Sequence, residues 1–214
     1  MAAPPEVDCR HLTGKFVMNK TLSDDVDALL ILQGIGWWTR KAIGLATVVL
    51  TIKEYTKDNL IHIDIIQVAS GLSTSNENRV LNWTDTEHPD KIFGTVIGRS
   101  RMFKAEDFSM VGPGGPDDAT FLQGKKLKDM KTDTSFLDHE HVQSFVTSVK
   151  GGWTAEQIWG FETIDGKKYY TRRVVGRKAD KVERVRLVYD YKGQVAAAKN
   201  DDDDDDGLAY GEDN

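Results

Sequence analysis

The chain has 214 residues, of which 39% are hydrophobic and 29% charged, a balance typical of a folded domain with one substantial core. Its formal net charge is −6, and the run Asp201 to Asp206 alone supplies six negative charges. The rest of the chain is therefore close to neutral and lacks the basic field that attracts nucleic acid. We expect no nucleic-acid partner.

Cysteine content and hydropathy indicate the compartment. The single cysteine, Cys9, excludes an internal disulfide and favours a reducing environment. The first residues lack the apolar core of a secretory signal, and no stretch reaches the roughly 20 apolar residues of a membrane span. We therefore predict a cytoplasmic protein without a transmembrane segment.

The N-terminal part combines one strand with two short helices. A strand is predicted at residues 14–20. Ser23, followed by two aspartates, is a favourable helix start, because serine caps a helix and acidic residues meet the positive end of its dipole. The first helix is expected over residues 24–32 and the second over residues 36–45. Helices this short are marginal alone and must lie on an apolar surface.

From Thr47 onward the apolar residues follow the period of strands, with short turns that suit antiparallel pairing. Strands are predicted at residues 47–55, 60–70, 77–84, 91–103, 141–150, 153–163, 167–177 and 182–191. Residues 104–139 are a long insertion with a strong Gly-Pro loop signal. Long irregular loops in compact domains tend to be functional lids or disordered segments.

Successive hairpins of this number cannot remain a flat sheet with long exposed edges, and closure is the economical solution. We predict a mainly β fold: a single closed antiparallel β-barrel of about ten strands, with a helix-turn-helix lid after the first strand. The expected organisation is a flexible leader (1–11), a barrel domain (12–193) and a disordered acidic tail (194–214).

Two motifs resemble a known family. They are GKF at residues 14–16 and LQGIGWWTRK at residues 32–41. Both resemble the opening of intracellular fatty-acid-binding proteins of the calycin group, and the same segment looks like uncharacterised fungal proteins. The resemblance covers residues 12–52 and, in layout only, residues 153–191. It implies a ten-stranded barrel with a water-filled cavity and a helix pair that acts as the portal lid.

The last strand departs from that family. The family keeps an inward arginine and tyrosine there, which hold a ligand carboxylate, and Leu187 occupies the arginine position in this chain. Strand alternation places Leu187 and Tyr189 on one face, and Arg184 and Arg186 on the other. The carboxylate anchor is therefore predicted to be absent, which weakens the case for a free fatty acid as the ligand.

Other residues could replace that anchor. Arg99 and Arg101 share a face near a strand end, and Arg173 could act with Tyr169. Each arginine could equally be an exposed strand charge, since a buried guanidinium needs an acid or an anionic ligand. The candidate ligand-binding residues are Phe16, Trp37, Trp38, Trp83, Arg99, Arg101, Trp159, Phe161, Tyr169, Arg173, Leu187 and Tyr189.

Catalytic and metal chemistry have few candidates. His62 and Asp64 share one face of a strand and could form an acid–base pair, but the isoleucines that alternate with them favour an outward position. Residues 138–141 contain two histidines without further ligands at metal spacing. We expect no metal and no cofactor.

The predicted function is the binding of a small hydrophobic or amphipathic molecule inside the barrel. The alternative is a cavity enzyme, a cyclase (pericyclase) or isomerase that acts on a secondary-metabolite intermediate, because orientation alone can accelerate such a reaction. A third hypothesis is a protein-interaction domain that uses the acidic tail. Arg40 and Lys41 on the lid could contact an anionic membrane surface transiently, or simply be solvated.

Overall fold

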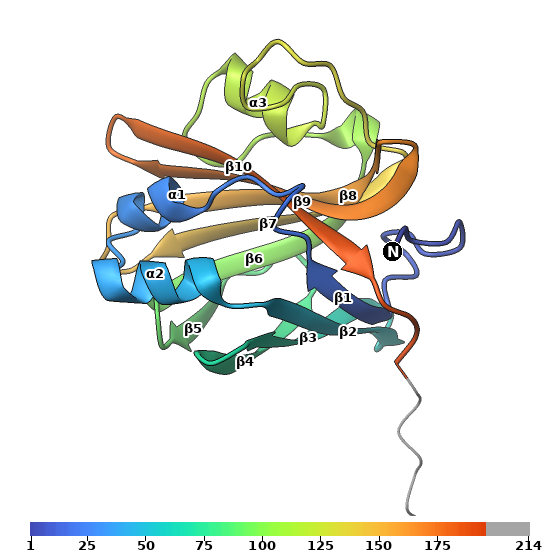
Figure 1. The fold of residues 1–214 in the computed structure, drawn as a ribbon, viewed down its shortest axis with the longest axis horizontal. Helices are drawn as coiled ribbons and strands as arrows, with labels where there is room; N and C mark the ends of the chain where they lie inside the picture. Colours follow the sequence, from blue (N-terminus) through green and yellow to red (C-terminus); the bar gives the residue numbers. More distant parts are fainter. Residues whose placement is uncertain (196–214) are drawn as a thin grey trace, which may run out of the picture.

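The structure is a computed structural model that describes residues 1–195, built from one curled antiparallel sheet and short helices (Figure 1). The elements in chain order are β1 (Gly14–Met18), α1 (Asp27–Leu32), α2 (Trp37–Leu45), β2 (Val48–Lys57), β3 (Leu60–Ala69), β4 (Ser73–Val80), β5 (Thr86–Asp90), β6 (Gly94–Lys104), the 3-10 helix η1 (Ala105–Asp107), α3 (Pro116–Leu122), β7 (Glu140–Ser148), β8 (Thr154–Ile164), β9 (Lys167–Lys178) and β10 (Lys181–Tyr191). No helix in this part of the chain is long and apolar enough to cross a membrane.

The strands form one ten-stranded sheet in the order β4-β3-β2-β1-β10-β9-β8-β7-β6-β5. The sheet curls so strongly that its edges, β4 and β5, lie 8 Å apart. Arg79 on β4 bridges this seam, donating from Nη1 to Ser100 Oγ on β6 (3.1 Å) and Ser144 Oγ on β7 (2.9 Å). The predicted barrel of ten antiparallel strands, with two helices after the first, is confirmed. The sequence did not indicate β5, a short edge strand that contains Pro89.

Apolar residues at every second position face the barrel interior. Leu50 and Ile52 on β2 and Ile63 and Ile65 on β3 are at most 1% exposed, and Ile52 pairs directly with Ile65. Burying each such side chain stabilises the fold by about 1.5–3 kcal/mol. A slip of one residue would turn the whole set outward, so this alternation also fixes the register of the strands.

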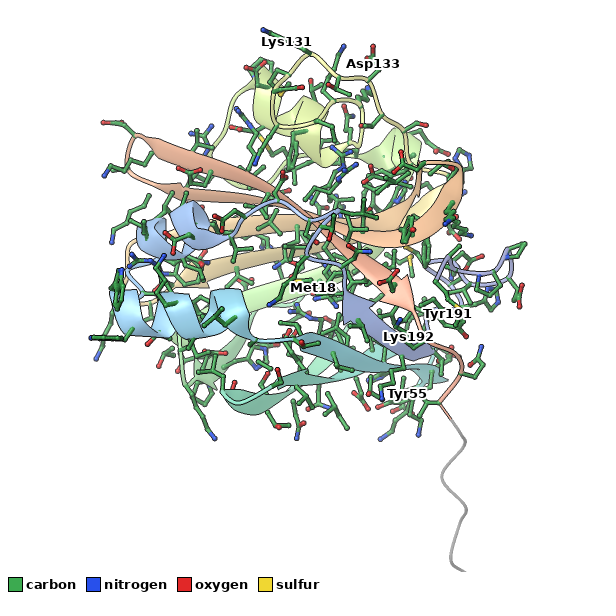
Figure 2. All side chains as sticks on the ribbon, in the orientation of Figure 1. Met18, Tyr55, Lys131, Asp133, Tyr191 and Lys192 are labelled. Atoms are coloured by element: carbon green, nitrogen blue, oxygen red, sulfur yellow. The ribbon has the colours of Figure 1, made fainter. Side chains whose placement is uncertain are left out.

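Residues 1–11, which the sequence predicts to be flexible, run across the end of the barrel opposite the helices (Figure 1). Ala3, Val7 and Cys9 are at most 5% exposed and join the main core cluster. These small apolar side chains, separated by polar ones, fill that end of the barrel. The chain leaves β10 at the same end, at Tyr191 and Lys192 (Figure 2). Apart from residues 194 and 195, the predicted acidic tail lies outside the described residues.

The segment before α1 differs from the sequence prediction. Helix α1 begins at Asp27, and Ser23 does not cap it. Ser23 Oγ instead accepts a hydrogen bond from the backbone N–H of Val188 (2.9 Å), and Asp24 accepts one from that of Arg186 (2.8 Å). The side chains that resemble a helix start therefore hold this segment against β10.

The insertion at 104–139 is a folded cover over the outer face of β8, β9 and β10 (Figure 1). Phe121 and Leu122 of α3 are fully buried against Ile158 and Val175 of the sheet. Only its outer tip, where Lys131 lies, extends away from the barrel (Figure 2). The insertion is neither a lid nor disordered, because it buries an apolar face of its own.

Two charged residues fasten this cover to the sheet. Arg173 of β9, fully buried, donates to both oxygens of Glu162 (2.9 and 2.8 Å) and to the backbone carbonyl of Phe121 (3.0 Å). Asp118 of α3, also fully buried, pairs with Arg177 and Arg184. Burial opposes the ionisation of Asp118, but these partners outweigh it and lower its pKa.

Candidate functional site

A cavity of about 1010 Å³ lies inside the barrel beneath the two lid helices. Residues of α1, of α2 and of all ten strands line it. This volume suits a drug-sized molecule. The structure thus contains the internal cavity that the sequence resemblance implies.

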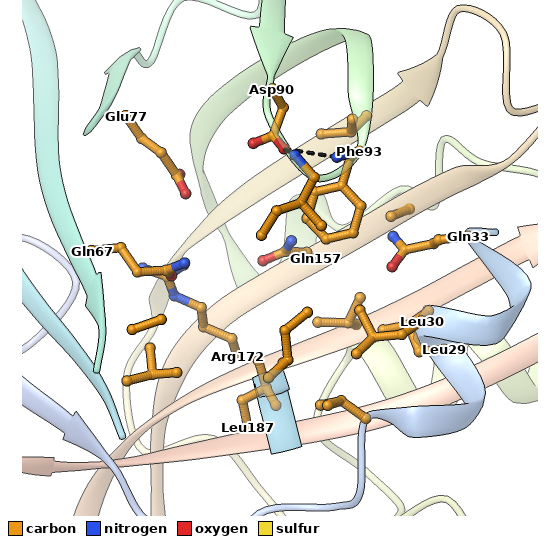
Figure 3. Close-up of a pocket in the computed structure, with 18 of the residues that line it drawn as sticks. Leu29, Leu30, Gln33, Gln67, Glu77, Asp90, Phe93, Gln157, Arg172 and Leu187 are labelled. Atoms are coloured by element: carbon orange, nitrogen blue, oxygen red, sulfur yellow. Dashed lines mark hydrogen bonds between the residues drawn. The ribbon is translucent and has the colours of Figure 1, made fainter. Parts of the chain in front are cut away.

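The cavity has apolar and polar lining, and Gln33 and Asp90 lie on the same side as Leu30 and Phe93 (Figure 3). Leu29 and Leu30 of α1 lie on one side with Phe93, where Trp153 and Val174 add apolar surface. Polar side chains gather on the side of β3 and β4. The members of this polar group are Gln67, Glu77, Arg79, Gln157 and Arg172. The cavity therefore offers both apolar and polar surface to an amphipathic molecule.

Arg172 on β9 is the most buried charge in this group, with 5% of its surface exposed. Its Nε donates to the hydroxyl of Tyr170 (2.9 Å), and its Cζ lies 4.0 Å from the ring centroid of Trp159. Burial opposes its charge, but the oxygens of Tyr170, Tyr189 and Glu77 raise its pKa, so Arg172 stays a cation. An aromatic face and a phenol hold it in place.

Arg79 also lies over the same indole, with Cζ 5.3 Å from the Trp159 ring centroid. Its Nε and Nη2 both donate to Glu77 Oε2 (3.1 and 2.7 Å). Burial opposes the ionisation of Glu77, but the charges of Arg79 and Arg172 outweigh it and lower its pKa. Arg79 and Glu77 thus neutralise one another at the seam between β4 and β6.

The predicted ligand-binding residues divide between the cavity, the core and the surface. Arg99, Leu187 and Tyr189 line the cavity. The inward position of Leu187 and Tyr189 agrees with the strand alternation, and Arg184 and Arg186 form ion pairs on the other face.

Three predicted aromatic residues belong to the core instead. Phe16, Trp159 and Phe161 are fully buried in the cluster at the end of the barrel opposite the helices. Trp159 still contributes to the site, because the two guanidinium groups pack against its ring. Phe16 and Phe161 instead pack on Tyr170, with ring centroids 5.1 and 5.5 Å away.

The remaining predicted aromatic residues lie outside the cavity. Trp37 and Trp38 are 51% and 81% exposed on α2 and pack edge to face on each other. Trp83 has the guanidinium groups of Arg99 and Arg101 over its ring, both 4.7 Å from its centroid. Unlike Arg99, Leu187 and Tyr189, the three tryptophans and Arg101 do not line the cavity.

On β9 the sequence pointed to the wrong face. Arg173 lies on the outer face beneath the insertion, and strand alternation puts Tyr169 on the same face, whereas Arg172 faces the cavity. Both faces of β9 are buried, so burial and alternation alone could not select between them. A usable signal existed, because antiparallel pairing sets Arg172 directly opposite Leu187, which the alternation of β10 had already placed inward.

The candidate acid–base pair lies away from the cavity. His62 stacks on Tyr55 with ring centroids 5.1 Å apart, and Asp64 accepts a hydrogen bond from Asn78 (2.9 Å). Ile63 and Ile65 between and beside them are the inward residues. Neither His62 nor Asp64 lines the cavity.

Residues 138–141 lie at a second, smaller hollow near the insertion. His139 is exposed, whereas His141 is buried against Phe136, with ring centroids 4.6 Å apart. Within residues 1–195 no group of three or more His, Cys, Asp or Glu side chains could hold a metal ion.

Asp138 in this hollow should make stability depend on pH. Burial, opposed by Lys168, raises its pKa to about 6, and its Oδ2 has no hydrogen-bond partner in the described residues. A carboxyl group whose pKa is raised on folding contributes fully to stability only below its ordinary pKa of 3.8, and this contribution is lost as the pH rises from there through 6.

Asp138→Asn should therefore increase stability at pH 8 by about 1–3 kcal/mol and leave it nearly unchanged at pH 4. Thermal denaturation of both proteins at the two pH values measures the difference. A loss of stability at pH 8 would show that the ion pair with Lys168 (3.8 Å) outweighs the burial of the charge.

The curled ten-stranded sheet, the helix pair after β1 and the large internal cavity define a barrel of the fatty-acid-binding-protein, or calycin, type. Lipid binding protein 8 of Caenorhabditis elegans has this fold, with a TM-score of 0.50 and 11% sequence identity over 87% of this chain and 99% of that one. At this identity the likeness concerns the fold alone.

No family model matches the sequence, but curated proteins do. The chain is 30% identical over 207 residues to the probable pericyclase scpY of Mollisia scopiformis. The alignment covers 93% of this chain and 99% of scpY. It is 26% identical over 196 residues to the pericyclase pydY of Acremonium sp., covering 90% of this chain and 98% of pydY. The protein belongs to the family of scpY.

Proposed function

We propose that the protein is a pericyclase, which holds a flexible polyunsaturated molecule in its cavity and accelerates an intramolecular pericyclic rearrangement. The carrying observation is the kinship with scpY over 93% of the chain, in a fold that encloses a cavity of about 1010 Å³. This similarity favours the cavity enzyme over simple ligand binding.

A pericyclic reaction makes modest demands on the protein. Bonds form and break together in a cyclic transition state, so neither a nucleophile nor a general base is required. The cavity must bring the two reacting ends together, and well-oriented intramolecular reactions reach effective concentrations of about 10⁵–10⁸ M. The apolar surface of Leu29, Leu30 and Phe93 would fold a hydrocarbon chain. The absence of His62 and Asp64 from the cavity is consistent with this mechanism.

Simple binding is the second candidate, because the barrel type itself is built to enclose small apolar ligands. The two candidates differ in what happens to the bound molecule. A binding protein returns it unchanged, whereas a pericyclase returns an isomer of the same mass.

The test is the distribution of product isomers. The purified chain is incubated separately with the compounds that scpY and pydY convert, beside a protein-free sample, and the isomers are separated by chromatography. We expect one isomer to dominate with the protein, whereas the spontaneous reaction gives a mixture. Identical distributions with and without protein, for both compounds, would contradict the proposal.

A further inference from the structure

The most buried cation of the cavity, Arg172, has no acidic partner in contact. Among the described residues Arg172 forms no salt bridge; its Nη2 atom is buried without a hydrogen-bond partner, and its Nη1 atom, which is not buried, has none either. Leaving a buried charged donor unpaired costs free energy unless something else satisfies it. In Figure 3 Arg172 extends from β9 toward the side of the cavity where Gln67 and Glu77 lie. The site is suited to an acceptor that enters with the ligand.

The neighbouring charges do not provide that acceptor. Glu77 accepts two hydrogen bonds from Arg79, and the Nη1 of Arg79 is used by Ser100 and Ser144. This pair is electrically balanced and fixed across the seam. Arg172 therefore supplies the uncompensated positive charge of the polar side.

A second donor lines the same cavity. Gln157 lines the cavity, and its Oε1 accepts a hydrogen bond from the indole N–H of Trp159 (3.1 Å). This bond fixes the amide so that its NH₂ group, which has no partner among the described residues, is free to donate. The ring face of Trp159 thus packs against Arg172, and its indole N–H binds Gln157.

We infer that Arg172, assisted by Gln157, binds a carbonyl oxygen of the substrate that is conjugated with the reacting double bonds. Hydrogen bonds from a cation to that oxygen stabilise the negative charge that accumulates on it in the transition state. The substrate class is then a polyene with a terminal conjugated acyl group, its hydrocarbon part beneath α1. Naming a substrate in this way rests on the proposed function, whereas the oxygen site itself does not.

The test uses two matched polyenes, methyl retinoate, which has a conjugated ester carbonyl, and retinyl methyl ether, which lacks it. Their dissociation constants are measured by quenching of tryptophan fluorescence for the native chain, Arg172→Met and Arg99→Met. We expect the native chain to bind the ester about tenfold or more tightly than the ether, because a hydrogen bond to a charged group has this magnitude. Arg172→Met should abolish the preference and Arg99→Met should retain it.

The infrared carbonyl band of the bound ester gives a second readout that needs no variant. It should lie at lower frequency in the native chain than in an apolar solvent. Equal binding of the two probes, binding of neither, an unshifted band, or a preference that persists in Arg172→Met would overturn the inference. A carbonyl preference without any turnover would retain the oxygen site and reject the pericyclase. Turnover without the carbonyl preference would retain the pericyclase and reject the oxygen site.

Discussion

Leu187→Trp should reduce turnover by about a hundredfold while the fold persists, because small displacements of a bound substrate have effects of this size. Leu187 lines the cavity between the apolar surface under α1 and the polar group around Arg172, which it faces across the β9–β10 pair. The larger side chain can extend into open space, so it should not overpack the core. It would occupy the volume in which the hydrocarbon must fold.

The matched control is Ile66→Trp on β3, since Ile66 is 47% exposed and does not line the cavity. Both variants are compared with the native chain by initial rates and by thermal denaturation. If Leu187→Trp keeps the native rate and stability, the reaction does not take place in this cavity.

Arg173→Met should destabilise the protein by about 3–5 kcal/mol, the usual result of breaking a buried ion pair from one side. The change removes the bidentate partner of Glu162, which is 1% exposed and keeps only Arg186 (3.2 Å) as a cation, and it removes the donors to the backbone of the insertion. Urea denaturation measures the loss, and limited proteolysis should cut residues 104–139 sooner.

Lys131→Met at the exposed tip of the insertion is the control and should leave the stability nearly unchanged. A loss below about 1 kcal/mol in Arg173→Met would mean that apolar packing alone holds the insertion. Arg172 and Arg173 are adjacent in sequence and face opposite sides of β9. Their methionine variants should therefore affect ligand preference and stability, respectively.

The architecture was accessible from the sequence because its signals are local. Alternation in β2 and β3, the positive-φ turn at Asp58 and Asn59, and the glycine-rich motif before α2 each specify their own segment. The inward position of Leu187 followed from the same alternation, together with the family resemblance.

The polar group of the cavity was not accessible in the same way. Arg172 and Arg173 are equivalent by composition, and the face of β9 that meets the cavity depends on what covers the other face. The insertion covers that other face. The residues that fasten it, Asp118 of α3 and Arg173 of β9, lie far apart along the chain. Glu77 and Arg79 are likewise recognisable only once β4 lies beside β6 at the seam.

The number of turnovers tests the central claim most directly. The chain is mixed with a hundredfold excess of the compound that pydY converts, and isomer formation above the protein-free rate is counted per molecule of protein. A pericyclase predicts many equivalents of an isomer of unchanged mass, and fewer with Leu187→Trp. Recovery of the compound unchanged, or conversion of at most one equivalent, would contradict the account and leave a binding protein.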